Sequence, residues 1–146
     1  MLFRSLLHPN DVSRLQEFGQ YLRSAYGTNL LENAQITVDG ETGDCLRQDD
    51  DASCMGKNAQ MEIVIRWKHP VSIHRVVMKE QLSFSQRVER YAIDLWQEGA
   101  WREAAQGSVI GHKRIAVLQP AAAEAMRIRI LDSRVAPVMR FVGVYA

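Results

Sequence analysis

The chain lacks the features that mark membrane, nucleic-acid-binding and unfolded proteins. Of its 146 residues, 47% are hydrophobic and 24% are charged, which is the balance of a folded globular protein. No stretch approaches the ~18 consecutive apolar residues that cross a bilayer, and residues 1–7 are too short for a complete signal peptide. The formal net charge of +1 favours neither a nucleic-acid nor a membrane partner. The length suits one core, alone or with an appendage.

Catalytic and metal-binding motifs are missing as well. HExxH, CxxC and GxSxG do not occur, and the four histidines are not spaced as pairs of metal ligands. The stretch GSVIGHKR, residues 107–114, has one residue too few between its glycines for a phosphate loop, and His112 precedes the lysine. The sequence therefore supports no zinc site, no esterase nucleophile and no phosphate loop.

Cysteine is scarce, and both copies fall in one acidic segment between Asp39 and Asn58. Cys45 and Cys54 would suit a small disulfide-closed turn in an oxidising compartment, or two thiols in a reducing one. Asp49, Asp50 and Asp51 are weak candidates for calcium ligands. Calcium needs about six to eight ordered oxygens, so a solvated acidic loop is the favoured interpretation.

The first part of the chain has the spacing of an amphipathic helix. Apolar residues recur there at steps of three and four, at Val12, Leu15, Phe18, Leu22 and Tyr26. Asn10 or Asp11 can cap the helix at its start, and Gly27 stands where a helix stops. A lone helix of this length is marginal in water, so its apolar face must pack against a partner.

From Asn33 onward the hydrophobic period changes to two, as in MEIVIRW, RYAIDLW and MRIRI. In MRIRI the alternation places Met126, Ile128 and Ile130 inward, with Arg127 and Arg129 outward. Breaks are expected at QEGA, GSVIG and QPAAAEA. About eight strands follow, near 35–38, 60–67, 72–80, 87–97, 101–108, 110–119, 125–133 and 138–145. The predicted fold is all-β, an antiparallel β-sandwich of the jelly-roll type preceded by one α-helix.

Large aromatic residues can act as sugar-stacking platforms or as core residues. For Trp67, Trp96 and Trp101 a core position is favoured, because large aromatics dominate core energetics. Trp96 is the most inclined of the three to face outward. The arginines of MRIRI have no aromatic residues between them, which argues against nucleic-acid binding.

Two parts of the sequence resemble one enzyme family. Residues 6–34, LLHPNDVSRLQEFGQYLRSAYGTNLLENA, are similar to the last helix of the catalytic domain of family 29 α-L-fucosidases. Residues 86–115 and 127–145, QRVERYAIDLWQEGAWREAAQGSVIGHKRI and RIRILDSRVAPVMRFVGVY, resemble the C-terminal β-sandwich of the same enzymes. That sandwich is related to discoidin-like and galactose-binding modules.

The resemblance implies a division into two parts. Residues 1–32 would be a remnant of the catalytic barrel, and residues 33–146 a discoidin-like sandwich that serves as a C-terminal, carbohydrate-binding-module-like accessory domain. The alternative is an interaction module that docks the catalytic barrel or another subunit and binds no ligand. Retaining glycoside hydrolases carry their catalytic carboxylates on barrel strands, and none of those strands is present. We therefore expect no catalysis by this chain alone.

The resemblance also suggests ligands and residues. Fucosylated or galactose-containing glycans would be the partners, and the polar candidates are Glu80, Gln86, Arg87, His112 and Arg114. Each of these could equally be a structural hydrogen-bonding residue. Related modules often hold a structural calcium ion with a glutamate before the last strand, where this chain has Arg140. We expect no cofactor, and Arg140 to pair with one of Asp49, Asp50 and Asp51 instead. The location would be extracytoplasmic if the longer enzyme to which this domain would belong carries a signal peptide.

Overall fold

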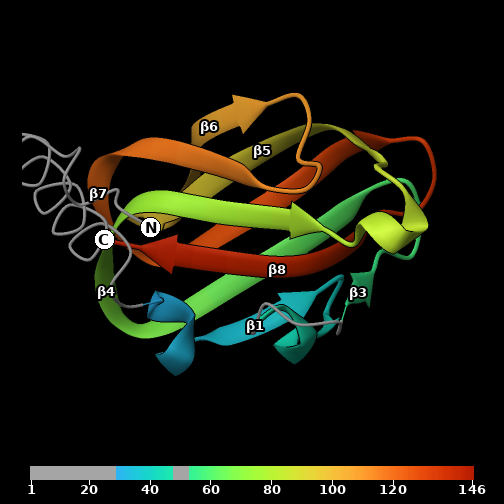
Figure 1. Ribbon diagram of the computed structural model, residues 1–146. Helices are drawn as coiled ribbons and strands as arrows, with labels where there is room; N and C mark the ends of the chain where they lie inside the picture. Colours follow the sequence, from blue (N-terminus) through green and yellow to red (C-terminus); the bar gives the residue numbers. More distant parts are fainter. Residues whose placement is uncertain (1–28, 48–52) are drawn as a thin grey trace, which may run out of the picture.

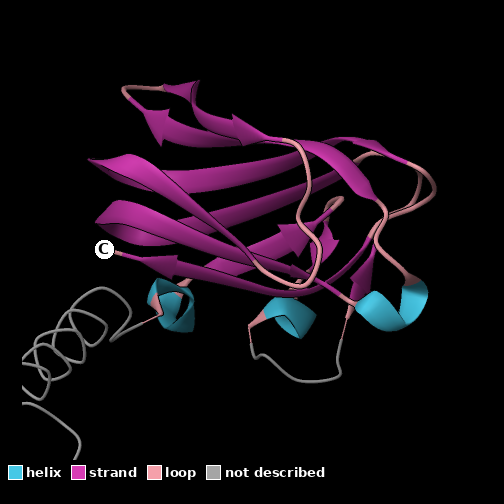
Figure 2. Cartoon of the chain, turned by 45° about the horizontal axis from the view of Figure 1, so that its top comes forward, coloured by secondary structure: helices cyan, strands magenta, loops and turns pink. Residues whose placement is uncertain are grey.

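The computed structural model describes residues 29–47 and 53–146, and in these residues the chain is almost entirely β-structure. The strands are β1 Gln35–Val38, β2 Glu41–Thr42, β3 Cys54–Met55, β4 Met61–Glu80, β5 Val88–Gln97, β6 Ala100–Gly107, β7 Arg114–Ser133 and β8 Val138–Tyr145. Three short 3₁₀ helices, η2 Leu30–Asn33, η3 Asp44–Leu46 and η4 Leu82–Phe84, lie along one side of the β-structure (Figure 2). The predicted number of strands is confirmed, whereas the predicted N-terminal helix lies outside the described residues. No helix in the described part is long and apolar enough to span a membrane.

All of the strand pairings are antiparallel, and β4 and β7 hold the fold together. The first half of β4 lies between β1 and the second half of β7, and β2, β5 and β6 extend this group. The second half of β4 lies between β8 and the first half of β7, and β3 extends that group. Figure 1 shows both long strands curving at the end of the molecule where the C-terminus lies. The two groups therefore share β4 and β7.

The core is a single cluster of apolar side chains that both groups supply. Its fully buried members include Ile63 and Ile65 of β4, Ile93 of β5, Met126 of β7 and Val142 of β8. Strand residues alternate between the core and the opposite face, as the two-residue period predicts. The inward positions expected for Met126, Ile128 and Ile130 are confirmed.

Two of the predicted strand breaks are wrong. Residues 60–67 and 72–80 belong to one strand, β4, and the alanine-rich stretch around Pro120 lies inside β7. Pairing continues through both stretches, because Val71–Ile73 pair with residues 121–123. Register shifts on either side of these pairs accommodate the bend. Pro120 falls between paired residues, so its missing amide N–H removes no hydrogen bond of the ladder. The long-range pairing outweighs the local turn signal.

The hairpin turns, by contrast, follow local chemistry. Glu98 and Gly99, which join β5 to β6, both have positive φ, of 53° and 78°. This is the type I′ geometry that matches the twist of the flanking strands. Asp39 and Gly40 join β1 to β2 with the same geometry, at 50° and 84°. The turn predicted at QEGA is confirmed.

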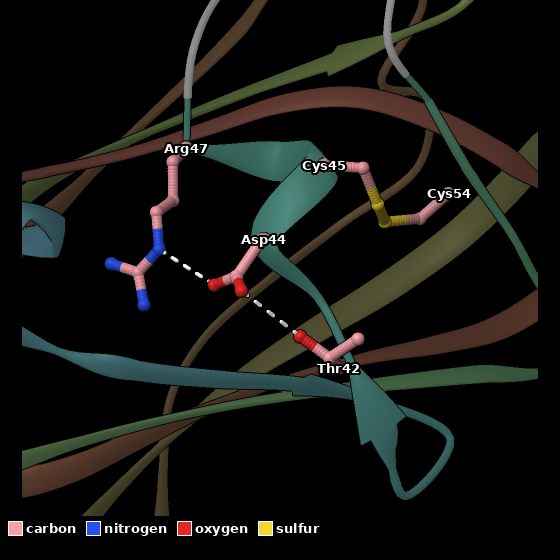
Figure 3. Close-up of a disulfide and its surroundings, with 5 residues drawn as sticks. All are labelled: Thr42, Asp44, Cys45, Arg47 and Cys54. Atoms are coloured by element: carbon pink, nitrogen blue, oxygen red, sulfur yellow. Dashed lines mark hydrogen bonds and ion pairs between the residues drawn. A yellow bond between two sulfur atoms is a disulfide. The ribbon is translucent and has the colours of Figure 1, made fainter.

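Of the two alternatives for the cysteines, the structure has the disulfide. Cys45 of η3 and Cys54 of β3 are bonded, with their Cα atoms 5.9 Å apart (Figure 3). The same helix carries Asp44, whose carboxylate accepts hydrogen bonds from Arg47 Nε at 2.8 Å and from the Thr42 hydroxyl at 3.2 Å. The bond from Arg47 holds the pKa of the Asp44 carboxyl below its usual value, with a further contribution from Thr42. The segment is thus joined to β3 by a covalent bond.

Removing this disulfide is expected to destabilise the domain. The bond closes a loop of about ten residues, for which the loss of loop-closure entropy in the unfolded chain corresponds to about 2.5 kcal/mol. Urea unfolding of the Cys45→Ser, Cys54→Ser double variant should show a decrease of that size in the free energy of unfolding. A reducing agent should destabilise the parent chain to the same extent and leave the variant unchanged. Equal stability of the oxidised and reduced parent would contradict the expectation.

Candidate functional site

Three loops meet at the end of the molecule away from the C-terminus (Figure 1). They are residues 81–87, which contain η4, residues 108–113 and residues 134–137. Backbone hydrogen bonds connect them: Glu80 N–H donates to Gly111 O at 2.9 Å, and Arg134 N–H donates to Arg87 O at 3.1 Å. We call this region the loop end.

Glu80 is the centre of the loop end. Its side chain is buried, with a relative exposure of 2%. One carboxylate oxygen accepts from the amides of Arg87 and Val88, at 2.8 and 3.0 Å, and the other accepts from the amide of Gly111 at 2.7 Å. Hydrogen bonds to an ionised acceptor are roughly twice as strong as neutral ones. Glu80 therefore ties the loop after β4 to the loop before β7.

Arg87 fastens the third loop. Its Nε donates to Phe84 O at 2.8 Å and its Nη1 donates to Ala136 O at 2.9 Å. The guanidinium also lies 5.9 Å from the centre of the Phe84 ring, within the range of a cation–π contact. The sequence allowed two roles for Glu80 and Arg87, a contact with sugar or a structural hydrogen bond. In the structure both residues make structural hydrogen bonds.

A cavity of about 190 Å³ opens at the loop end. Its lining residues are Lys79, Glu80, Gln81, Leu82, His112 and Arg140. His112 is exposed at its rim. Gln86 lies beside the neighbouring Gly111, where an added Cβ would stand 3.2 Å from the Gln86 amide oxygen. Arg114 does not line the cavity, and its Nε donates to the Tyr91 hydroxyl at 3.2 Å.

The sequence missed several residues at this end. The cavity is also lined by Lys79, Gln81, Leu82 and Arg140. Of these, the sequence singled out only Arg140, and it did so as a partner for acidic residues. Leu82 and Phe84 are exposed apolar side chains in a loop, a pattern that could have marked the region. The expected partners of Arg140, at positions 49–51, lie outside the described residues, and the described part contains no cluster of three or more possible metal ligands.

A second group of polar side chains lies on the outer face of β5 and β7. Asp94 has a relative exposure of 2% and accepts hydrogen bonds from Arg127 Nε at 2.8 Å and from Arg129 Nε at 2.6 Å. The bond to Asp94 raises the pKa of Arg129, against the opposing effect of burial. Arg127 and Arg129 lie on the face opposite the core, as the alternation predicted. One buried carboxylate thus holds two arginines in place.

The tryptophans continue this group. The Arg127 guanidinium lies 4.5 Å from the centre of the Trp101 ring, and Trp101 meets Trp96 edge to face, with ring centres 5.3 Å apart. The core positions favoured for Trp96 and Trp101 are therefore wrong, because the two residues pair on the outer face and β6 is the last strand of its group; Trp96 was the one singled out as most inclined to face outward. The core position of Trp67 is confirmed, and its Nε1 donates to Leu30 O at 2.9 Å.

Comparison with known proteins identifies what the chain is similar to. No protein-family model matches it. It is 21% identical to α-L-fucosidase 1 of Arabidopsis thaliana over 154 residues, which cover 96% of this chain and 30% of that protein. The structure of a family 29 fucosidase of Ruminococcus gnavus in complex with fucose matches with a TM-score of 0.83 and 23% identity, over 95% of this chain and 30% of that one.

An isolated module has the same fold. Chitosan-binding module 1 from the chitosanase/glucanase of Paenibacillus sp. IK-5 matches with a TM-score of 0.70 and 12% identity, covering 81% of this chain and 98% of the module. The chain spans 29 to 30% of the length of the plant fucosidases it matches. The resemblance seen in the sequence is confirmed: over almost all of its length, the chain is similar in sequence and in structure to one part of the family 29 α-L-fucosidases.

Proposed function

We propose that this chain is the C-terminal accessory domain of a family 29 α-L-fucosidase. The observation that supports this proposal is the extent of the similarity, because the alignment covers 96% of this chain but only 30% of the Arabidopsis fucosidase. In this proposal residues 1–32 belong to the catalytic barrel by origin and residues 33–146 form the accessory domain. The barrel supplies the catalytic carboxylates, and this chain supplies none.

The proposed architecture is a jelly-roll β-sandwich of the galactose-binding type. Two observations support it. The two strand groups share β4 and β7, and their alternate residues supply a single core, as the two sheets of a sandwich do. The matching fold of the chitosan-binding module, nearly all of which is covered, is that of a carbohydrate-binding protein.

The loop end is the proposed contact for glycans. His112 and Gln86 would contact the sugar at the cavity, with Arg114 farther along β7, while Glu80 and Arg87 hold the loops that carry the contacts. No tryptophan lines the cavity, so affinity for one sugar residue should be weak, on the order of 1 mM or about −4 kcal/mol. The expected ligands are fucosylated or galactose-containing glycans.

A titration of the ¹⁵N-labelled chain with methyl α-L-fucoside and methyl β-D-galactoside tests the glycan contact. The amide signals of residues 108–113 should shift and saturate in the millimolar range, and the variant His112→Ala should weaken this binding. The variant His74→Ala, on the second half of β4 and away from the cavity, is the matched control and should bind as the parent does.

The alternative is a docking module without a ligand. The exposed apolar side chains of Leu82, Phe84 and Val135 at the loop end favour it, because a partner surface could cover them. In that case both sugars leave the spectrum unchanged, and the separately produced catalytic barrel of the parent enzyme shifts the signals of these loops instead.

A further inference from the structure

A groove of about 700 Å³ lies beside β1. It is lined by residues 33–37, by residues 66–68 of β4 and by side chains of the segment from Gly40 to Arg47, which contains η3. It shares no residue with the loop-end cavity. We call it the β1 groove.

Two cations of β4, Arg66 and Lys68, point to the outer face of the β-structure at this groove. Both are exposed, whereas Trp67 between them is buried. Alternate residues of a strand share a face and stand about 6.6 Å apart, so one anionic group can reach both side chains. Arg66 is paired with Gln35 of β1 and with Ala125 of β7, and both neighbours are uncharged. Among the described residues, no carboxylate forms an ion pair with either cation.

The pairing register places polar side chains of β1 and β2 on the same face as these cations. Gln35 is paired with Arg66, and Thr37 is paired with Thr42 of β2. Residues that are directly paired in an antiparallel ladder share a face, and the buried Ile36 between Gln35 and Thr37 points the other way. The amide and the two hydroxyls can each donate or accept a hydrogen bond. The outer face at the groove therefore combines positive charge with groups that suit sugar hydroxyls.

The other wall of the groove is held in place by its own hydrogen bonds. The Asp44 carboxylate accepts from Arg47 Nε at 2.8 Å and from the Thr42 hydroxyl at 3.2 Å (Figure 3). The two terminal nitrogens of Arg47 donate to the carbonyl oxygens of Leu31 and Ala34. A wall that is ordered before the ligand arrives loses little conformational entropy on binding.

The charges select the class of ligand. Three lining residues, Arg47, Arg66 and Lys68, are positive and one, Asp44, is negative, so the lining carries two surplus positive charges. Because Asp44 offsets Arg47, the surplus belongs to the two cations of β4. Guanidinium and ammonium groups form strong, charge-assisted hydrogen bonds to carboxylate and sulfate oxygens. A neutral sugar would leave this charge unused.

We propose that the β1 groove binds a saccharide residue that carries a carboxylate or a sulfate group. Arg66 and Lys68 bond to the anionic group, and Gln35 and Thr37 contact the hydroxyls of the sugar ring. This inference goes beyond the proposed function, because it assigns a different class of ligand to a groove that shares no residue with the loop-end cavity. It holds or fails independently of binding at His112.

A titration of the ¹⁵N-labelled 146-residue chain at constant ionic strength tests the proposal. The probes are galactose 6-sulfate, galacturonic acid, galactose, inorganic sulfate and a triglutamate peptide. At least one charged sugar should shift the amide signals of residues 34–37 and 66–68, with saturation on the order of 1 to 10 mM. The two charged sugars distinguish a sulfated from a carboxylated ligand. Galactose should leave these signals in place, and inorganic sulfate and the peptide should bind more weakly than the better charged sugar.

Variants assign the effect to the two cations. Arg66→Gln and Lys68→Gln, which change exposed side chains, should each weaken binding about threefold, and the double variant about tenfold. Arg102→Gln is the matched control: it removes the same charge from an exposed arginine of β6, which lies across the molecule from β1 (Figure 1) and pairs with Glu98. It should bind as the parent does. His112→Ala should leave the shifts of residues 34–37 unchanged, which separates this groove from the loop end.

Four results would overturn the proposal. The first is that the signals of residues 34–37 do not move with about 100 mM of either charged sugar, which exceeds the expected dissociation constant at least tenfold. The second is that galactose binds as tightly as the charged sugars. The third is that inorganic sulfate or triglutamate does so, which would mean a general anion contact and no saccharide site. The fourth is that the Arg66→Gln, Lys68→Gln double variant binds as tightly as Arg102→Gln.

Discussion

Replacing Glu80 by alanine is expected to lower the free energy of unfolding by about 4 kcal/mol. The carboxylate accepts hydrogen bonds from three backbone amides, of Arg87, Val88 and Gly111, and is 2% exposed. Alanine would leave these amides without their acceptor in a place that water reaches poorly. Urea unfolding followed by tryptophan fluorescence measures the loss.

Glu80→Gln refines this prediction. The amide oxygen of glutamine can still accept from Arg87 and Val88, but its NH₂ group would face the amide N–H of Gly111, a donor against a donor. We expect an intermediate loss of about 2 kcal/mol. Glu89→Gln is the matched control, since Glu89 pairs with Arg134 at the surface and should change stability by less than about 0.5 kcal/mol. A Glu80→Ala variant as stable as the control would mean that the loops do not depend on this carboxylate.

The second large effect is expected at Asp94. Asp94→Ala removes the acceptor of both Arg127 and Arg129 and should lower the free energy of unfolding by about 3 kcal/mol. The loss should be smaller than at Glu80, because the two arginine side chains are 21% and 34% exposed and can turn to water. Because the bond to Asp94 raises the pKa of Arg129, the arginine's part of this stabilisation is fully present at the ordinary arginine value and is lost as the pH rises through the raised one.

Glu103→Gln is the control for Asp94. Glu103 stands 3.8 Å from Arg129 Nη2 in the same group of charges, but its side chain is 49% exposed, so its removal should have little effect. Asp94→Ala should also loosen Trp101, and a red shift of the tryptophan emission would report this. Equal stability of the two variants would show that Asp94 has no greater role than its exposed neighbour.

The sequence predicted those parts of the fold that local chemistry determines. The alternation in MRIRI placed Ile128 inward and Arg127 outward, and the glycine of QEGA marked a turn that needs positive φ. It could not predict that Asp94 would meet residues 33 and 35 positions later, because strand register depends on pairing between distant segments.

The dependence on contacts between distant segments also limited the prediction of the site. Glu80 and His112 were predicted together and line one cavity, but the amide of Gly111 that holds Glu80 is 31 positions away. The predicted break near Pro120 failed for a related reason, since composition marks a turn while pairing with residues 71–73 keeps the segment extended. Trp101 was placed in the core because the sequence does not show that β6 lies at the edge.

The sharing of β4 and β7 by both strand groups bears on how the domain unfolds. Met61 of β4 is paired with Ile130 of β7, so the ladder that unites the groups joins segments from opposite halves of the chain. Neither group can separate without breaking this ladder, and such distant contacts must form before either group is complete. The domain should consequently lose its structure in a single cooperative step, and it should regain that structure slowly.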